Sequence, residues 1–88
     1  MRKIKVSKWF GEKLHDAAFN YHRFLKYDYT QHPTIDTKIA DHTIVYVAAV
    51  LAESEKAYQM ALEASNTNDD YREWITWIPK SQIEEVLG

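Results

Sequence analysis

The feature that most constrains this chain is the stretch from Tyr71 to Pro79. It holds two of the three tryptophans, and its tryptophan, isoleucine, threonine and tyrosine residues predict a β-strand. Side chains alternate between the two faces of a strand. One face carries Ile75, Trp77 and Pro79, and the other carries Arg72, Trp74, Thr76 and Ile78. The first face is wholly apolar and is our predicted core. The second mixes charge with a large ring, which makes Trp74 a candidate for exposure.

The length of 88 residues indicates one domain, residues 1–88. There is no cysteine, so disulfides and thiolate metal sites are not available to stabilise it. Aromatic residues make up 14% of the chain and are its main resource for burial. A homodimer would add further burial, and the sequence leaves the oligomeric state open.

The pattern of charged and apolar residues indicates a cytoplasmic protein that contacts no membrane. Residues 1–8 are basic and polar, without the apolar segment of a signal peptide. The longest apolar run, residues 44–52, is far shorter than the ~18 residues of a membrane span. The absence of cysteine fits a reducing compartment.

The N-terminal third predicts a short strand followed by a helix. Ile4 and Val6 alternate with lysines, as in an edge strand, and Ser7 can cap a helix. From Lys8 to about Tyr29 apolar residues recur at helical spacing, at Phe10, Leu14, Ala17, Tyr21 and Phe24. Gly11 costs about 1 kcal/mol inside a helix relative to alanine. It therefore indicates either close packing against a neighbouring backbone or a ragged first turn.

Four further segments follow from local signals. Pro33 and its neighbours break the helix at residues 30–34, and residues 35–41 form an ambiguous connector. Residues 65–70 are polar and rich in turn formers, which predicts a loop. Ser81 followed by Glu84 is a capping box, and it predicts a short C-terminal helix over residues 82–87.

Residues 42–64 allow two interpretations. The many alanines and leucines suit a helix, with a stripe through Val47, Leu51, Tyr58 and Leu62 that Ser54 interrupts. The β-branched run at residues 43–47 and the alternation at residues 56–63 suit two strands instead. Residues 53–56 would then form the turn. Periodicity alone favours strands only slightly.

A resemblance favours the strands. The sequences Glu53-Ser54-Glu55-Lys56-Ala57-Tyr58 and Trp77-Ile78-Pro79-Lys80-Ser81-Gln82-Ile83 resemble small, uncharacterised phage and mobile-element proteins in which an "ETEKA" strand pairs with a strand ending in "WIPKS". The similarity covers roughly residues 50–83 and implies a hairpin there. It implies no catalytic residues.

We therefore predict an α+β fold in which the N-terminal amphipathic helix packs on a three- to four-stranded antiparallel sheet, with a short C-terminal helix. The strands of this sheet would be residues 43–52, 56–64 and 71–79, with residues 4–6 at an edge. The alternative is an all-α bundle in which residues 42–64 form one helix.

Nothing in the sequence indicates catalysis, a cofactor or a metal site. His15 and His22 are seven residues apart, about 10.5 Å along a helix, which is too far for two imidazoles to share one ion without help from His32, His42 or a carboxylate. Asp41 and His42 are adjacent, and adjacent strand residues point to opposite faces. With glycine only at positions 11 and 88, there is no phosphate-binding loop. We predict that the protein is not an enzyme.

Charge distribution limits nucleic-acid binding. The net charge is −2, but residues 1–13 carry five basic side chains and one acidic one, while the rest of the chain is acidic. A basic tip on an acidic body does not suit broad duplex binding. Single-stranded nucleic acid, which stacks on aromatic rings beside cations, is our alternative partner. Its candidate contacts are Lys3, Lys5, Lys8, Trp9 and Lys13.

Our leading hypothesis is a non-catalytic protein-binding accessory protein. Tryptophan, tyrosine and arginine dominate the energetics of protein interfaces. The candidate partner-binding residues are Tyr27, Tyr29, Tyr71, Arg72 and Trp74. The resemblance to mobile-element proteins implies a host or phage protein as partner, for instance a host defence nuclease such as a CRISPR effector that this chain would inhibit.

Overall fold

The computed structural model describes residues 1–31 and 40–88. Its elements are β1 (Lys3–Ser7), α1 (Lys8–Asn20), β2 (Phe24–Leu25), β3 (Tyr27–Gln31), β4 (Ala40–Glu53), β5 (Ala57–Ser65), β6 (Tyr71–Pro79), a 3-10 turn η1 (Lys80–Gln82) and β7 (Ile83–Leu87). The predicted break at residues 30–34 and the connector at 35–41 lie mostly outside the described residues. The predicted loop at residues 65–70 is present, between β5 and β6.

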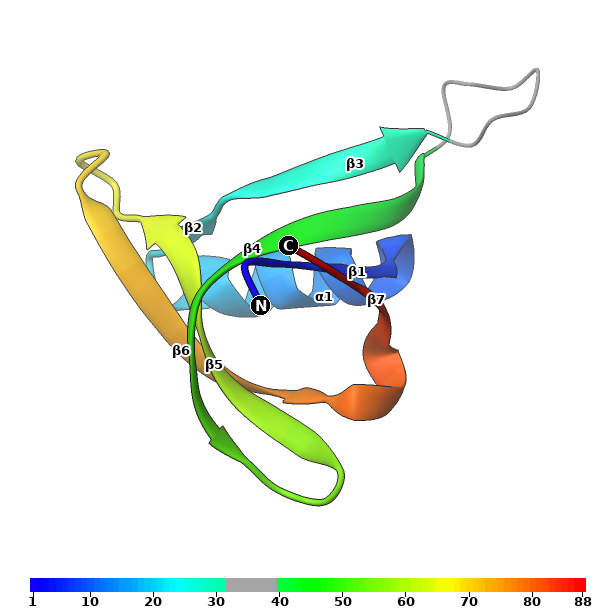
Figure 1. Cartoon of the computed structure of the whole chain (residues 1–88). Helices are drawn as coiled ribbons and strands as arrows, with labels where there is room; N and C mark the ends of the chain where they lie inside the picture. Colours follow the sequence, from blue (N-terminus) through cyan, green and yellow to red (C-terminus); the bar gives the residue numbers. More distant parts are fainter. Residues whose placement is uncertain (32–39) are drawn as a thin grey trace.

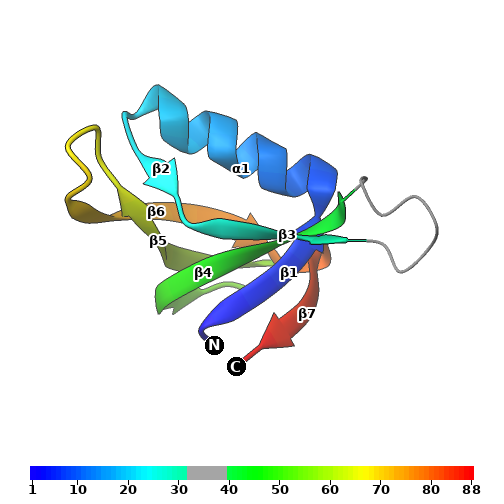
Figure 2. The same cartoon turned by 90° about the horizontal axis from the view of Figure 1, so that it is seen from above.

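The strands form one strongly bent, seven-stranded antiparallel sheet organised around β4 (Figure 1). The first half of β4 pairs with β1 on one side and β3 on the other, and its second half pairs with β5. Strand β5 pairs in turn with β6, and β1 pairs with β7. The helix α1 covers one face of this sheet (Figure 2). The predicted sheet of three to four strands is therefore wrong in size, and β1 is an interior strand rather than an edge.

The prediction of two strands in residues 42–64 is confirmed, and the helical bundle is wrong. β4 and β5 are joined by a tight turn in which the Ser54 hydroxyl accepts the Ala57 N–H at 3.1 Å. The β5–β6 hairpin implied by the resemblance is present along its whole length, from the pair Ala57–Pro79 to the pair Ser65–Tyr71. Strands β5 and β6 hold much of the core, because Met60 and Leu62 of β5 and Ile78 of β6 are fully buried.

The predicted helix is right at its start and wrong at its end. It was expected to reach about Tyr29, but α1 ends at Asn20 and the chain turns through His22, whose φ is 56°. Phe24 continues the helical spacing, which masks this end in the sequence. Tyr27 and Tyr29, however, alternate as a strand requires, and β3 pairs with β4. Tyr21, assigned to the apolar stripe, is exposed.

Gly11 marks a close approach between α1 and β4. A Cβ atom at this position would lie 2.5 Å from Cβ of Thr43, which is itself buried. Phe10, Leu14 and Ala18 are buried on the same side of the helix. Of the two interpretations of this glycine, close packing is the correct one, although the neighbour is a side chain rather than a backbone.

The predicted C-terminal helix is wrong. After the η1 turn the chain enters β7, which pairs with β1, and the N–H of Arg2 donates to the Gly88 carbonyl at 2.8 Å. The capping box is not formed, since η1 has no side-chain cap. Ile83 packs against the core. The strand also pairs with the N–H and C=O groups along one edge of β1, which a helix at this position would leave unpaired. Tertiary pairing thus overrides the local capping signal.

The face assignment of β6 is reversed. Ile75 and Trp77, the predicted core, are 54% and 49% exposed, and Pro79 is exposed too. Ile78 is fully buried and Trp74 packs against the core. The register with β5 explains this, because Ile78 lies opposite Tyr58 and Trp74 lies opposite Leu62 on the side of the sheet that faces α1.

Ser7 caps α1, as predicted: its hydroxyl accepts the N–H of Phe10 at 3.2 Å. Replacing Ser7 by alanine should lower the free energy of unfolding by about 0.5–2 kcal/mol, because that N–H loses its partner. Urea denaturation measures the effect, and Ser7→Thr, which keeps a hydroxyl, is the control. Equal losses in the two variants would contradict a capping role.

Candidate functional site

The structure divides the five predicted partner-binding residues among different surfaces. Tyr27 and Tyr29 lie on β3, while Tyr71, Arg72 and Trp74 lie on β6. Alternation along β6 places Tyr71 on the outer face of the sheet, away from α1, and Arg72 and Trp74 on the inner face. Trp74 is only partly exposed and packs against the core. The predicted patch is therefore not a single surface.

Tyr27 and Tyr29 instead belong to a row of aromatic rings between β3 and α1. The Tyr27 ring lies 5.1 Å from Tyr29 and 5.3 Å from His15, and Phe19 connects His15 to Phe24. Burial, followed by a hydrogen bond with Tyr27, raises the pKa of Tyr29. These ring contacts, of which all but the tilted His15–Phe19 pair are edge-to-face, help to fix the helix on the sheet. Tyr27, a predicted partner-binding residue, is therefore a packing residue.

The predicted nucleic-acid contacts are also separated. Lys3 and Lys5 lie on the outer face of the sheet, where Lys3 covers the Tyr46 ring and Lys5 lies 3.9 Å from the carboxylate of Glu85. Lys8, Trp9 and Lys13 belong to α1. Trp9 is 62% exposed, with the Lys13 amine 5.1 Å from its ring centre. No single groove brings the two groups together in the part of the chain that the structure describes.

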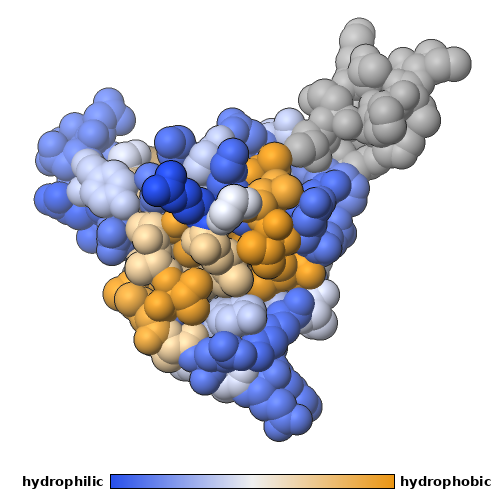
Figure 3. Space-filling view, viewed as in Figure 1, coloured by the Kyte–Doolittle hydropathy of each residue, from blue (hydrophilic) through white to orange (hydrophobic). Residues whose placement is uncertain are grey.

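The largest exposed apolar side chains of the hairpin lie on the outer face of β6. We define the β6 outer face as Tyr71, Glu73, Ile75 and Trp77. Ile75 lies opposite Ala61 of β5, and Trp77 lies opposite Gln59. Val50 and Leu51 of β4, which pairs with the other side of β5, are exposed as well. Hydrophobic residues gather over β4 and its neighbours on the face opposite α1, bordered by hydrophilic ones (Figure 3).

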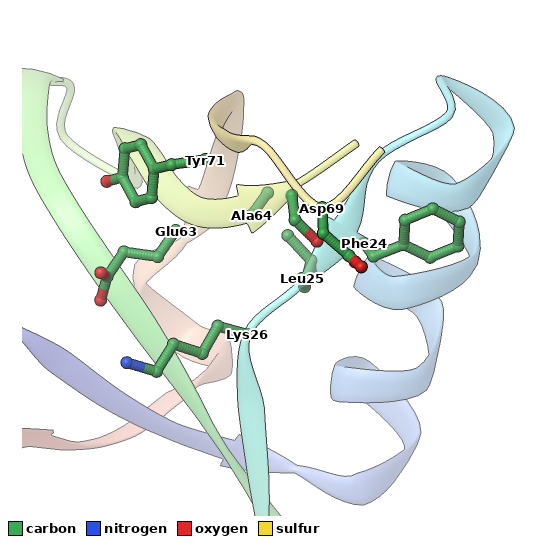
Figure 4. Close-up of a pocket in the computed structure, with 8 residues that line it drawn as sticks. Phe24, Leu25, Lys26, Glu63, Ala64, Asp69 and Tyr71 are labelled. Atoms are coloured by element: carbon green, nitrogen blue, oxygen red, sulfur yellow. The ribbon is translucent and has the colours of Figure 1, made fainter. Parts of the chain in front are cut away.

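The Tyr71 end of this face carries charged groups around a pocket of about 370 Å³ (Figure 4). The Lys26 amine and the Glu63 carboxylate point to the same side of this pocket, and the Tyr71 ring lies beside Glu63. The Tyr71 hydroxyl donates to Glu73 at 3.3 Å. Partial desolvation, followed by the charges of Glu73 and Glu63, raises the pKa of Tyr71. The side of the pocket next to Tyr71 therefore carries both charges, from Lys26 and Glu63.

Tyr46 links the two halves of the sheet on the same face. Its ring contacts the amines of Lys26 and Lys3, at 4.5 and 5.8 Å from the ring centre, and its hydroxyl donates to the carboxylate of Asp28. This hydrogen bond is the main cause that raises the pKa of Tyr46 above its ordinary 10.0.

Asp28→Asn should therefore lower the pKa of Tyr46, because an ionised phenol would no longer face a carboxylate. In the folded state the Tyr46 hydroxyl keeps its proton at a pH where the unfolded chain has lost it. The hydrogen bond to Asp28 therefore stabilises the fold fully below pH 10.0, and this stabilisation is lost as the pH rises further. Absorbance titration of the tyrosines measures the change, and Tyr46→Phe should remove the late-ionising group. An unchanged titration of Asp28→Asn would contradict the assignment.

Among the described residues, no group of three or more histidine, cysteine or acidic side chains is placed to hold a metal ion. His42 lies with Nδ1 2.6 Å from the Glu84 carboxylate, and His15 is part of the aromatic row. His32 lies outside the described residues. In the same described ranges, no helix has the length and hydrophobicity needed to cross a membrane.

Comparisons with protein-family models, with curated proteins and with solved structures find no match to this chain. Sequence reasoning placed Ile75 and Trp77 in the core and so missed them as surface residues. The signal that could have found them is the pairing with β5, whose Met60 and Leu62 share one face and determine which face of β6 is buried.

Proposed function

We propose that this protein is a small protein-binding module that contacts its partner through the β6 outer face. The observation that carries the proposal is the exposure of Ile75 and Trp77 side by side on a strand whose other face is core. Exposed apolar patches rimmed by polar residues mark interaction sites, and tryptophan is among the residues that contribute most to binding. Tyr71 adds a second aromatic ring, beside Glu63 at the edge of the pocket.

We further propose a host defence nuclease, such as a CRISPR effector, as the partner that this module inhibits. The support is the resemblance of residues 50–83 to phage and mobile-element proteins, together with the acidic character of the chain beyond residue 13. Nucleases bind polyanions through basic surfaces, and an acidic module can cover such a surface.

Photo-cross-linking tests the surface. A photoreactive amino acid at position 75 should cross-link one protein in nuclease-treated host extract, and the additional change Trp77→Ser in the same chain should abolish the capture. Trp9→Ser is the matched control, because Trp9 is a comparably exposed tryptophan on α1. Loss of capture in Trp9→Ser with retention in Trp77→Ser would contradict the proposal, provided that circular dichroism shows both variants to be folded.

A further inference from the structure

Strand β6 is paired on one side only in the part of the chain that the structure describes. All nine of its residues, Tyr71–Pro79, are in register with β5, and no described strand pairs with its other edge. An open edge of this length presents a row of backbone donors and acceptors that can pair with another chain.

The backbone groups that point outward can be identified from the hydrogen bonds that flank the hairpin. The Lys80 N–H donates to the Lys56 carbonyl at 2.8 Å, and the Asn66 N–H donates to the Asp70 carbonyl at 3.1 Å. Directly opposite residues alternate between bonded and non-bonded pairs in antiparallel strands. Even-numbered residues of β6 therefore bond to β5, and the outward N–H groups belong to the odd-numbered residues Tyr71, Glu73, Ile75 and Trp77.

An independent contact agrees with this assignment. The carbonyl of Glu63, which lies opposite Glu73, accepts the Lys26 N–H at 3.0 Å from the far side of β5. The backbone groups of Glu63 thus point away from β6. Those of Glu73, its partner in a non-bonded pair, must in turn point away from β5. The outward amides consequently belong to the same residues whose side chains form the β6 outer face.

Space exists beside this edge. A groove of about 480 Å³ is lined by four consecutive β6 residues, 73–76, and by Tyr21 and Arg23 from the end of α1. The Arg23 guanidinium donates hydrogen bonds to the backbone carbonyls of His22, at 3.2 Å, and Tyr21, at 3.5 Å. An extended segment can therefore lie against the β6 edge in this groove.

The charged residues at the β6 edge determine which side chains such a segment should carry. Glu63 and Glu73 lie directly opposite each other on the outer face, and like charges in this position are unfavourable. No ion pair joins either carboxylate to a base among the described residues. Arg2 and Lys3 line the same pocket as Glu63 and Glu73, but the Lys3 amine lies over the Tyr46 ring rather than against either carboxylate. A strand added beside β6 would place one of its own side chains opposite Glu73, where a cation is favoured.

We propose that β6 binds an extended segment of its protein partner as an additional antiparallel strand. The segment carries a basic residue opposite Glu73 and apolar residues opposite Ile75 and Trp77, in a period-two pattern. This inference rests on the proposed function and adds the mode of recognition to it.

A second copy of this chain is the less suitable occupant. Outward residues pair with outward residues when two β6 edges meet, and this set contains no base: it consists of Tyr71, Glu73, Ile75, Trp77 and Pro79. The one basic residue of β6, Arg72, points its side chain to the other face. Self-pairing would therefore place no cation of the second copy opposite Glu73.

The test uses the full chain and a display library of random nonapeptides. We expect enriched peptides to carry a basic residue two positions from an apolar one, with a further apolar residue two positions beyond. N-methylation of the peptide amide that faces the β6 edge should weaken binding of the synthetic peptide at least tenfold, because it removes an inter-strand hydrogen bond and keeps the side chains. Glu73→Lys should reverse the preference, so that a peptide with glutamate in place of the basic residue binds better.

Three outcomes would overturn strand addition. They are peptide binding that is insensitive to N-methylation, the absence of any enriched period-two pattern, and a concentration-dependent dimer in sedimentation that excludes the peptides. In the first two cases the proposed function stands if position 75 still cross-links a protein in a manner that depends on Trp77. The dimer would instead identify the edge as a self-association surface. Loss of both cross-linking and peptide binding would remove the proposed function as well.

Discussion

Replacing Ile78 by alanine is expected to lower the free energy of unfolding by about 2–5 kcal/mol. Ile78 is fully buried on the inner face of β6, in the same cluster as Met60 and Leu62, so truncation leaves a cavity in the core. A domain of this size has only about 3–5 kcal/mol of net stability from its core, so the variant should be largely unfolded. Urea denaturation followed by tryptophan fluorescence measures the loss.

Trp77→Ala is the matched control for Ile78→Ala. Trp77 precedes Ile78 in β6 and is larger, but its side chain is half exposed on the opposite face. Its replacement should change stability by about 1 kcal/mol or less, since substitutions at the surface are usually small. If Trp77→Ala proved the more destabilising of the two, the face assignment of β6, and with it the proposed binding surface, would be wrong.

Gly11→Ala should lower the free energy of unfolding by about 1–3 kcal/mol, the usual cost of overpacking a core. The added methyl group would lie 2.5 Å from both Cβ and Oγ1 of Thr43, so α1 has to move away from β4. On an isolated helix the same change would stabilise by about 1 kcal/mol, so the sign of the effect reports the close approach.

Glu12→Ala serves as the control for Gly11→Ala. Glu12 is the next residue of α1 and is exposed, so its replacement adds helix propensity without a steric conflict. Thermal unfolding of both variants makes the comparison. A stabilised Gly11→Ala protein would contradict the described packing of α1 on β4.

The strands of the hairpin region could be predicted because their residues are strand formers in themselves. The β-branched run in β4 and the alternation of Tyr58, Met60 and Leu62 in β5 carry the period of a strand. The polar residues between them provide the turn. The alanines and leucines of residues 42–64 also suit a helix, so periodicity alone favoured strands only slightly and the resemblance of residues 50–83 decided between the two.

The two ends of the chain show why the rest could not be predicted. Phe24 satisfies the spacing of α1 by coincidence, and Ser81 with Glu84 satisfies the rule for a helix start, yet both segments form strands. Each pairs with a partner far away in the sequence, β2 with β5 and β7 with β1. Local signals carry no information about such partners, and the hydrogen bonds of the sheet outweigh them.

The candidate site was mispredicted for a related reason. Alternation divides β6 correctly into two sets of residues, but it does not determine which set is buried. Both sets contain a tryptophan and an isoleucine, so hydrophobicity does not distinguish them. The register with Met60 and Leu62 of β5 decides, and it moves Ile75 and Trp77 from the expected core to the surface.

Amide hydrogen exchange along β6, measured by NMR on the free chain, tests the central claim of an open edge most directly. The structure predicts alternating protection, with slow exchange at Trp74, Thr76 and Ile78, whose N–H groups bond to β5, and fast exchange at Glu73, Ile75 and Trp77. Addition of a selected peptide should slow the exchange of the second set. Uniform protection of all six amides in the dilute free chain would contradict the account, because the outer edge of β6 would then already be covered.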